Sequence, residues 1–171
     1  MNKFSNVNWA AFLLGGFWGI FNGIFLWIMI VWGIAFALSF RSAEIIHSVG
    51  THGDVILRAF SVEAHILTIV CCYVLMNACS IYLAAKGNHI LSERIQKGNL
   101  GTLKEVEARA VVRVRQRWQI LCGAPFRIMM YFFMAQPSTI LFFLLLVIDV
   151  LSFAIVLYLA EKLHQKKEWI I

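Results

Sequence analysis

The feature that most constrains this chain is an apolar run without a single charged residue, residues 7–40. As one continuous helix it would be about 50 Å long, whereas the hydrocarbon core of a bilayer is about 30 Å thick. We expect it to divide near Asn22-Gly23, so that residues 8–21 enter as a short interfacial or re-entrant helix and residues 24–40 cross the membrane. A single, strongly tilted helix is the alternative.

Two further apolar blocks complete the pattern. The first is residues 65–85, and the second, residues 120–160, again exceeds one crossing. Gln136-Pro137-Ser138 divides the second block, because proline lacks an amide donor and biases the preceding residue away from the helical region. We therefore expect an antiparallel pair of segments, residues 120–135 and 139–160.

Composition assigns the chain to the membrane class. It is 61% hydrophobic and 14% charged over 171 residues, whereas soluble domains are about 45–50% apolar and about 25% charged. So few charges cannot cover the apolar residues with a polar surface, which makes lipid the solvent. The sequence predicts an all-α, polytopic membrane protein, with one domain over residues 1–171 and four membrane segments.

Orientation follows from basic residues near the membrane ends, which favour the cytoplasmic side. The loop of residues 86–118 carries eight basic side chains against three acidic ones, and the tail adds three lysines. Together with Lys3, these charges predict that both termini are cytoplasmic. The rival topology has three spans, with residues 120–135 in the interface and the tail outside. The basic residues are Lys86, Arg94, Lys97, Lys104, Arg109, Arg113, Arg115 and Arg117 in the loop, and Lys162, Lys166 and Lys167 in the tail.

The start of a helix is signalled within the basic loop. Thr102-Leu103-Lys104-Glu105 has the form of a capping box. Arg109, Arg113 and Arg117 then recur every four residues on one face, a composition typical of an amphipathic helix lying flat on the cytoplasmic surface. Since the basic residues lie beside apolar spans, we expect anionic lipid headgroups as partners, and no nucleic acid, despite a net charge of +6.

Small residues form the sharpest local pattern. Ala11, Gly15, Gly19 and Gly23 recur every four residues, which would place them on one helix face. Small residues on such a face let another backbone approach closely in lipid. The face either docks a partner membrane subunit or a second copy of the chain, or it packs on the second or fourth span of the same chain.

Two ionisable residues lie deep in the apolar blocks, Arg127 and Asp149. Each would cost about 2.5–3.5 kcal/mol at a helix centre. They lie ten residues before and twelve residues after Pro137, so a hairpin brings them to depths that differ by about 3 Å. We expect them to pair, either as a gate or proton relay or as a structural pair that fixes helix register.

Metal and catalytic signatures are weak. His65, Cys72 and Cys79 recur every seven residues, about 10.5 Å apart along a helix, too far to converge on one metal ion. His47 and His52 suggest at most a pH-sensitive or metal-binding loop. Asn77 and Ser80 are typical of interhelical hydrogen bonding. The sequence lacks a phosphate-binding loop, HExxH and G-x-S-x-G, so we expect no metal, no cofactor and no enzyme activity.

Two segments resemble a known family. Asn8-Trp9-Ala10-Ala11-Phe12, followed by Gly15-Gly16-Phe17-Trp18, is similar to the N-W-A-A-F and G-P-F-W-like opening of a bacterial family of small integral membrane proteins of unknown function. Gly87-Asn88 resembles a G-N segment that follows a later span in that family. The resemblance implies a multi-pass protein of the bacterial inner membrane and implies no activity.

Three hypotheses for function follow from these patterns. The leading one is an accessory or scaffold subunit that acts through the small-residue face and the basic cytoplasmic surface. The alternative is a small transporter or channel component, in which Arg127 and Asp149 line a polar path with Asn77 and Ser80. A membrane enzyme using loop histidines or carboxylates is the third.

Overall fold

The computed structural model describes residues 7–24, 26–52, 55–97, 105–135 and 138–165. In these ranges every regular element is a helix, two short ones followed by four long ones. They are α1 (Trp9–Leu14), α2 (Gly16–Phe21), α3 (Trp27–His52), α4 (Val55–Gln96), α5 (Glu105–Ala135) and α6 (Thr139–Gln165).

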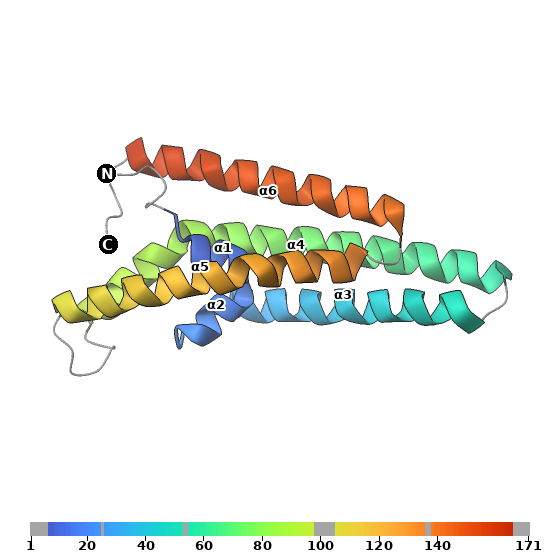
Figure 1. The fold of residues 1–171 in the computed structure, drawn as a ribbon, viewed down its shortest axis with the longest axis horizontal. Helices are drawn as coiled ribbons and strands as arrows, with labels where there is room; N and C mark the ends of the chain where they lie inside the picture. Colours follow the sequence, from blue (N-terminus) through green and yellow to red (C-terminus); the bar gives the residue numbers. More distant parts are fainter. Residues whose placement is uncertain (1–6, 25, 53–54, 98–104, 136–137, 166–171) are drawn as a thin grey trace.

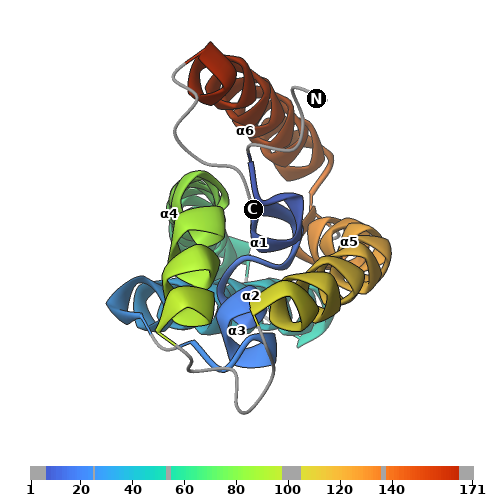
Figure 2. The same cartoon turned by 90° about the vertical axis from the view of Figure 1, so that its left-hand side faces the viewer.

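The four long helices run antiparallel to their neighbours in the chain, α3 against α4 and α5 against α6 (Figure 1). The short pair α1 and α2 folds into the bundle rather than extending it. Seen from the end, α1 lies in the middle, with α4 on one side, α5 on the other and α6 above (Figure 2). The first segment therefore packs inside the bundle that later segments build.

Three of the long helices are long and apolar enough to cross a membrane, over Trp27–Ile46, Val62–Gln96 and Thr139–Lys162. Between 22% and 39% of each of these apolar windows is buried within the protein. Their exposed surface includes many large apolar side chains, such as Leu38, Leu67 and Val150, which suits a helix facing lipid. The predicted all-α fold is thus confirmed, with three helices that are long and apolar enough to cross a membrane. Each of these three segments ends later in the sequence than predicted, because its helix continues beyond the apolar stretch.

Buried side chains form three clusters, two of them around α1. One joins α1 and α2 to α4 and α5 through fully buried residues such as Ala11, Trp18 and Leu83. A second joins α1 to α4 and α6 through Phe12 and Val156. The largest cluster holds α3, α4, α5 and α6 together further along the bundle. In lipid such contacts stabilise by close packing rather than by leaving water.

The prediction of one continuous small-residue face is wrong, because the segment breaks twice. The Asn8 side chain caps α1 by accepting from the Ala11 amide at 3.0 Å, and α1 ends at Gly15, whose φ is +54°. A second break follows α2, where Gly23 has a φ of +61°. Both angles favour glycine, since a side chain there meets the backbone.

The expected surface helix is not a separate element. The basic segment is the first half of α5, which continues without a break into the apolar segment that ends at Ala135. Likewise, α4 carries its helix to Gln96, well into the predicted loop. The division of the last apolar block holds, since α5 ends at Ala135 and α6 begins at Thr139.

Candidate functional site

The two deep charges meet in the middle of the bundle. Arg127 on α5 donates from Nη2 to Asp149 Oδ1 on α6 over 2.7 Å. The second carboxylate oxygen accepts from the hydroxyl of Tyr73 on α4, over 2.6 Å. Each Asp149 oxygen therefore has a charged or phenolic donor, which offsets much of the cost of removing the carboxylate from water.

Arg127 also binds the broken end of α1. Its Nη1 donates to the Phe12 carbonyl over 2.9 Å, and its guanidinium lies 4.2 Å from the centre of the Phe12 ring. Phe12 lies in the last turn of α1, where backbone carbonyls lose their helical partners. A cation at this end also interacts favourably with the helix dipole.

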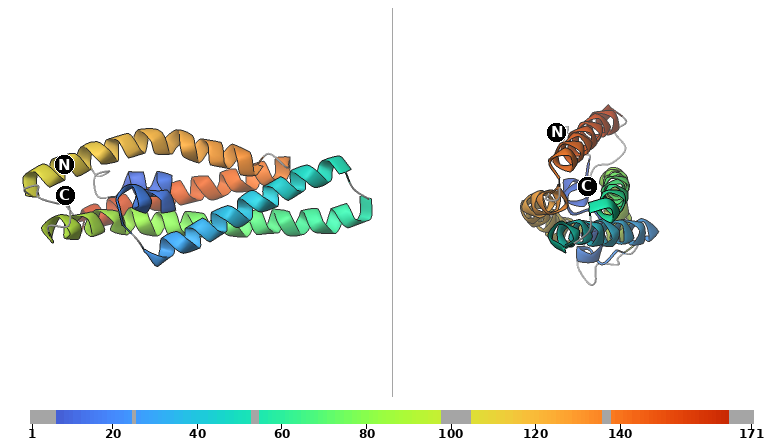
Figure 3. Two further views of the ribbon diagram at one scale, coloured as in Figure 1. Left: turned by 90° about the horizontal axis from the view of Figure 1, so that it is seen from below. Right: turned by 90° about the vertical axis from the view of Figure 1, so that its right-hand side faces the viewer.

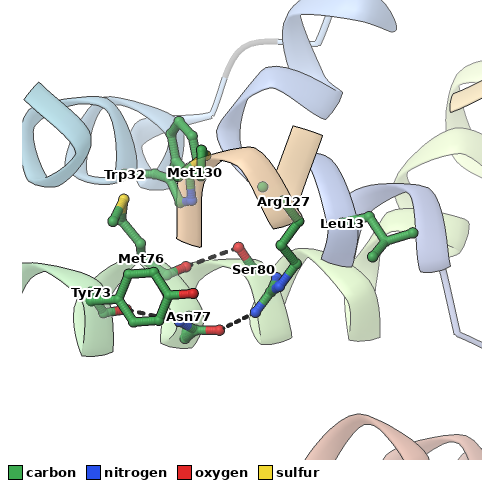
Figure 4. Close-up of a pocket in the computed structure, with 9 residues that line it drawn as sticks. Leu13, Trp32, Tyr73, Met76, Asn77, Ser80, Arg127 and Met130 are labelled. Atoms are coloured by element: carbon green, nitrogen blue, oxygen red, sulfur yellow. Dashed lines mark hydrogen bonds between the residues drawn. The ribbon is translucent and has the colours of Figure 1, made fainter. Parts of the chain in front are cut away.

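Asn77 on α4 completes the network. Its side-chain oxygen accepts from Arg127 Nη2, while its amide nitrogen donates back to the Tyr73 carbonyl at 3.0 Å. Figure 4 shows these groups turned toward one another across α4 and α5. One arginine thus joins α1, α4, α5 and α6, so its removal would leave unpaired polar groups on three other helices.

A small cavity of about 20 Å³ lies beside this network. It is large enough for one water molecule. Its wall includes Gly15, Trp32 and Ser80, and Figure 4 shows the last two. Ser80 donates to the Met76 carbonyl of its own helix over 2.9 Å. Of Asn77 and Ser80, only Asn77 bonds to another helix in the described contacts, and it does so as an acceptor from Arg127.

The small residues of the first segment accommodate close neighbours within the chain. A Cβ built on Gly15 would lie 2.4 Å from Trp32 Nε1, and one on Gly19 would lie 2.2 Å from the end of Met29. Ala11 is fully buried. These positions therefore pack on α3 and α4, and a partner chain cannot reach them without displacing those side chains.

The two segments that carry the family resemblance touch each other. The backbone N–H of Asn8 donates to the backbone carbonyl of Ala84 on α4 over 2.9 Å. A Cβ on Gly87 would lie 2.9 Å from the Asn8 side chain, so a larger residue there would push α1 from α4.

A second polar joint, missed by sequence reasoning, holds the turn after α2. Arg94 Nη1 on α4 donates to the carbonyls of Asn22 and Gly23, each over 2.8 Å. The Asn22 amide donates to the Gln119 side chain of α5 at 3.3 Å. The sequence gives no signal that Arg94 holds this turn, because its partners are backbone carbonyls, which every residue carries.

The predicted basic helix presents two kinds of exposed side chain. Arg113 and Arg117 are exposed, and Arg109 is half-buried. The neighbouring stripe of Val111, Val114 and Trp118 is exposed and apolar. This half of α5 therefore has an amphipathic outer face as well as a buried face on α2 and α4.

Metal-ligating side chains do not gather within the described ranges. His65 lies 3.3 Å from the Ser42 hydroxyl, and the four cysteines are free thiols. The side chains of His47 and His52 fall outside the part that the structure describes.

Comparisons with protein-family models, curated proteins and solved structures found no match. The family resemblance stays a prediction.

Proposed function

We propose that this chain is a four-segment protein of the bacterial inner membrane, with both ends cytoplasmic, that acts as an accessory or scaffold subunit. It would present a basic, amphipathic end to anionic lipid headgroups and to a partner subunit. The small-residue face has no part in this proposal, because it is occupied within the chain.

Aromatic residues support a membrane position centred on the ion pair. Trp118 lies nine residues before Arg127, and Tyr158 lies nine residues after Asp149. On antiparallel helices both therefore lie about 14 Å from the pair, toward the same end. Both are exposed, at 64% and 61%. Exposed Trp and Tyr gather at membrane interfaces, about 15 Å from the bilayer centre.

The opposite interface then falls at the turn between α5 and α6. Ala135 and Thr139 lie eight and ten residues from the pair, which corresponds to about 12 and 15 Å. By this reckoning the half of α5 that begins near Trp118 crosses the hydrocarbon core as the fourth segment. The mean hydropathy of the whole helix α5 is low because its first half carries several arginines, which lie beyond the interface.

The observation that carries the proposal is the one-sided distribution of charge. The end of α4, the start of α5 and the end of α6 lie together at one end of the bundle (Figure 1). The described residues there include eight basic residues against four acidic ones. Residues 41–64, around the opposite end, contain two basic and three acidic residues. The basic ones are Lys86, Arg94, Lys97, Arg109, Arg113, Arg115, Arg117 and Lys162.

Retention of partners and lipid tests this role. The intact protein is extracted in mild detergent, and its bound phospholipid and any stoichiometric subunit are measured. We expect Arg113→Glu with Arg117→Glu to remove most of the bound anionic lipid and the subunit, because both side chains are exposed. Arg113→Lys with Arg117→Lys keeps the charge and should retain both. Equal retention by the two double variants would reject the proposal.

Orientation is tested by labelling single cysteines with a membrane-impermeant maleimide, in a chain whose own cysteines are replaced. Thr139→Cys should label from outside the cell, and Lys162→Cys only after permeabilisation. The three-span topology requires the reverse result for both positions.

One observation favours transport as a second candidate. The break in the first segment at Gly15 lies beside the ion pair and a cavity of about 20 Å³. Broken helices and intramembrane charges mark ion paths in transporters. Proton flux into liposomes tests it: flux above that of protein-free vesicles, lost in Asp149→Asn, supports transport, and flux equal to that of the variant argues against it.

A further inference from the structure

A groove of about 620 Å³ opens between α1, α5 and α6. The volume falls within the range of pockets that hold small ligands. Seen from either end, α6 lies on the outside of the bundle, beside α1 and α5 (Figure 2 and the right-hand view of Figure 3). Four aromatic rings and aliphatic side chains form most of the wall, the rings being Phe12, Tyr131, Phe132 and Phe153.

The ion pair forms the polar part of this wall. Arg127 and Asp149 both line the groove, and their side chains are 17% and 22% exposed. The small cavity on the other side of the network includes Arg127 in its wall and does not include Asp149. The exposed part of the carboxylate therefore faces the groove. Polar surface of this kind is costly beside hydrocarbon unless a hydrogen-bonding group covers it.

Depth in the membrane limits what can enter. On the membrane position proposed above, on which this inference rests, the pair lies at the bilayer centre, about 15 Å from the headgroups. A phospholipid headgroup does not reach that depth, and an acyl chain brings no hydrogen-bonding group. The occupant must dissolve in hydrocarbon and still carry a polar group.

We propose that the groove binds a lipid-soluble molecule with a planar ring that bears a carbonyl or hydroxyl oxygen, such as an isoprenoid quinone or quinol. The flat ring fits between the aromatic side chains, which favour offset or edge contacts with another ring. A ring carbonyl would accept from Arg127, and a ring hydroxyl would donate to Asp149. The proposal concerns binding and includes no electron transfer.

Photolabelling tests the groove directly. The probe is a short-chain benzoquinone that carries a diazirine, added to the protein in lipid nanodiscs. We expect saturable labelling of groove residues on α5 and α6, displaced by unlabelled short-chain benzoquinone and not by a saturated hydrocarbon of equal length. Equal displacement by the hydrocarbon would show an acyl-chain groove and overturn the proposal.

Matched variants of α6 localise the label. Val150 lines the groove, and Val147 does not, although 61% and 55% of their surfaces are exposed. Val150→Trp should fill the groove and reduce labelling at least tenfold, while Val147→Trp should leave it unchanged. Equal effects of the two variants, or labelling spread over the lipid-facing side of α6, would reject the site.

The maleimide labelling of Thr139→Cys and Lys162→Cys, repeated in the same membranes, separates the two proposals. Normal orientation with no saturable labelling refutes the ligand alone. Reversed orientation refutes the membrane position on which the ligand inference depends.

Discussion

The first segment and the last helix show how differently apolar sequence is used in this protein. Helices α1 and α2 are six residues each, broken by glycine, and most of their residues are buried. Helix α6 is 27 residues of regular helix, and only 22% of its apolar window is buried. The more hydrophobic element is thus the more exposed one. In lipid, small residues and polar bonds decide which segment is buried, and hydropathy does not.

The ion pair connects these two regions, and breaking it should have the largest effect. Arg127→Leu leaves the partly buried Asp149 carboxylate without its charge partner and frees the Phe12 carbonyl of α1. We expect a loss of about 3–5 kcal/mol in unfolding free energy, measured by steric trapping in bicelles.

Removing both charges sharpens this result. Arg127→Leu with Asp149→Leu should be less destabilised than Arg127→Leu alone, because no isolated charge remains. Additive effects of the two substitutions would mean that the 2.7 Å contact contributes no coupling.

The break at Gly15 should give the next largest effect. Gly15→Ala forces a side chain into a backbone with φ +54° and against the Trp32 indole. We expect a loss of about 3 kcal/mol, seen as a lower melting temperature in detergent. Gly33→Ala, where a Cβ meets no atom within 4 Å, should instead gain up to about 1 kcal/mol from helix propensity. Equal melting temperatures for the two variants would contradict the packing of α1.

Two neighbouring leucines on α6 test the claim that burial on this helix is local. Leu145 is fully buried and Leu144 is 44% exposed. Leu145→Ala should cost about 2 kcal/mol, at the low end for buried leucine because lipid replaces water as the reference solvent. Leu144→Ala should change the melting temperature within error. A larger loss for Leu144→Ala would mean that another surface covers the exposed face.

The smallest effect is expected at Tyr73, which links the pair to α4. Tyr73→Phe removes the hydroxyl that donates to Asp149 over 2.6 Å. Hydrogen bonds between membrane helices contribute about 0.6 kcal/mol on average, so we expect a loss of that order in the steric-trapping measurement. If Tyr73→Phe lowered the unfolding free energy as much as Arg127→Leu does, the Tyr73 hydroxyl would stabilise Asp149 as strongly as the arginine, which contradicts this expectation.

Sequence reasoning reached the helical membrane class because hydropathy and charge are local properties. Counting from Pro137 also placed Arg127 and Asp149 at similar depth, and the structure brings the two together. The partners Tyr73, Asn77 and Phe12 lie on helices far away in sequence, so no spacing rule relates them to the pair.

The glycine repeat gave a wrong prediction of one helix face, because a four-residue spacing describes a helix face only while the helix continues. A positive φ at Gly15 ends the helix, and nothing in the spacing distinguishes a glycine that packs from one that turns. The continuity of α5 was missed because its basic and apolar halves were interpreted as separate elements.

The anchoring of α1 has a consequence for biogenesis. Its start is bound by the Ala84 carbonyl and its end by Arg127, so both anchors leave the ribosome long after α1 does. Until then the segment has no folded site to occupy and must wait at the membrane surface or beside the translocon. Helix α1 is synthesised before the helices that anchor it and is therefore among the last to reach its final position.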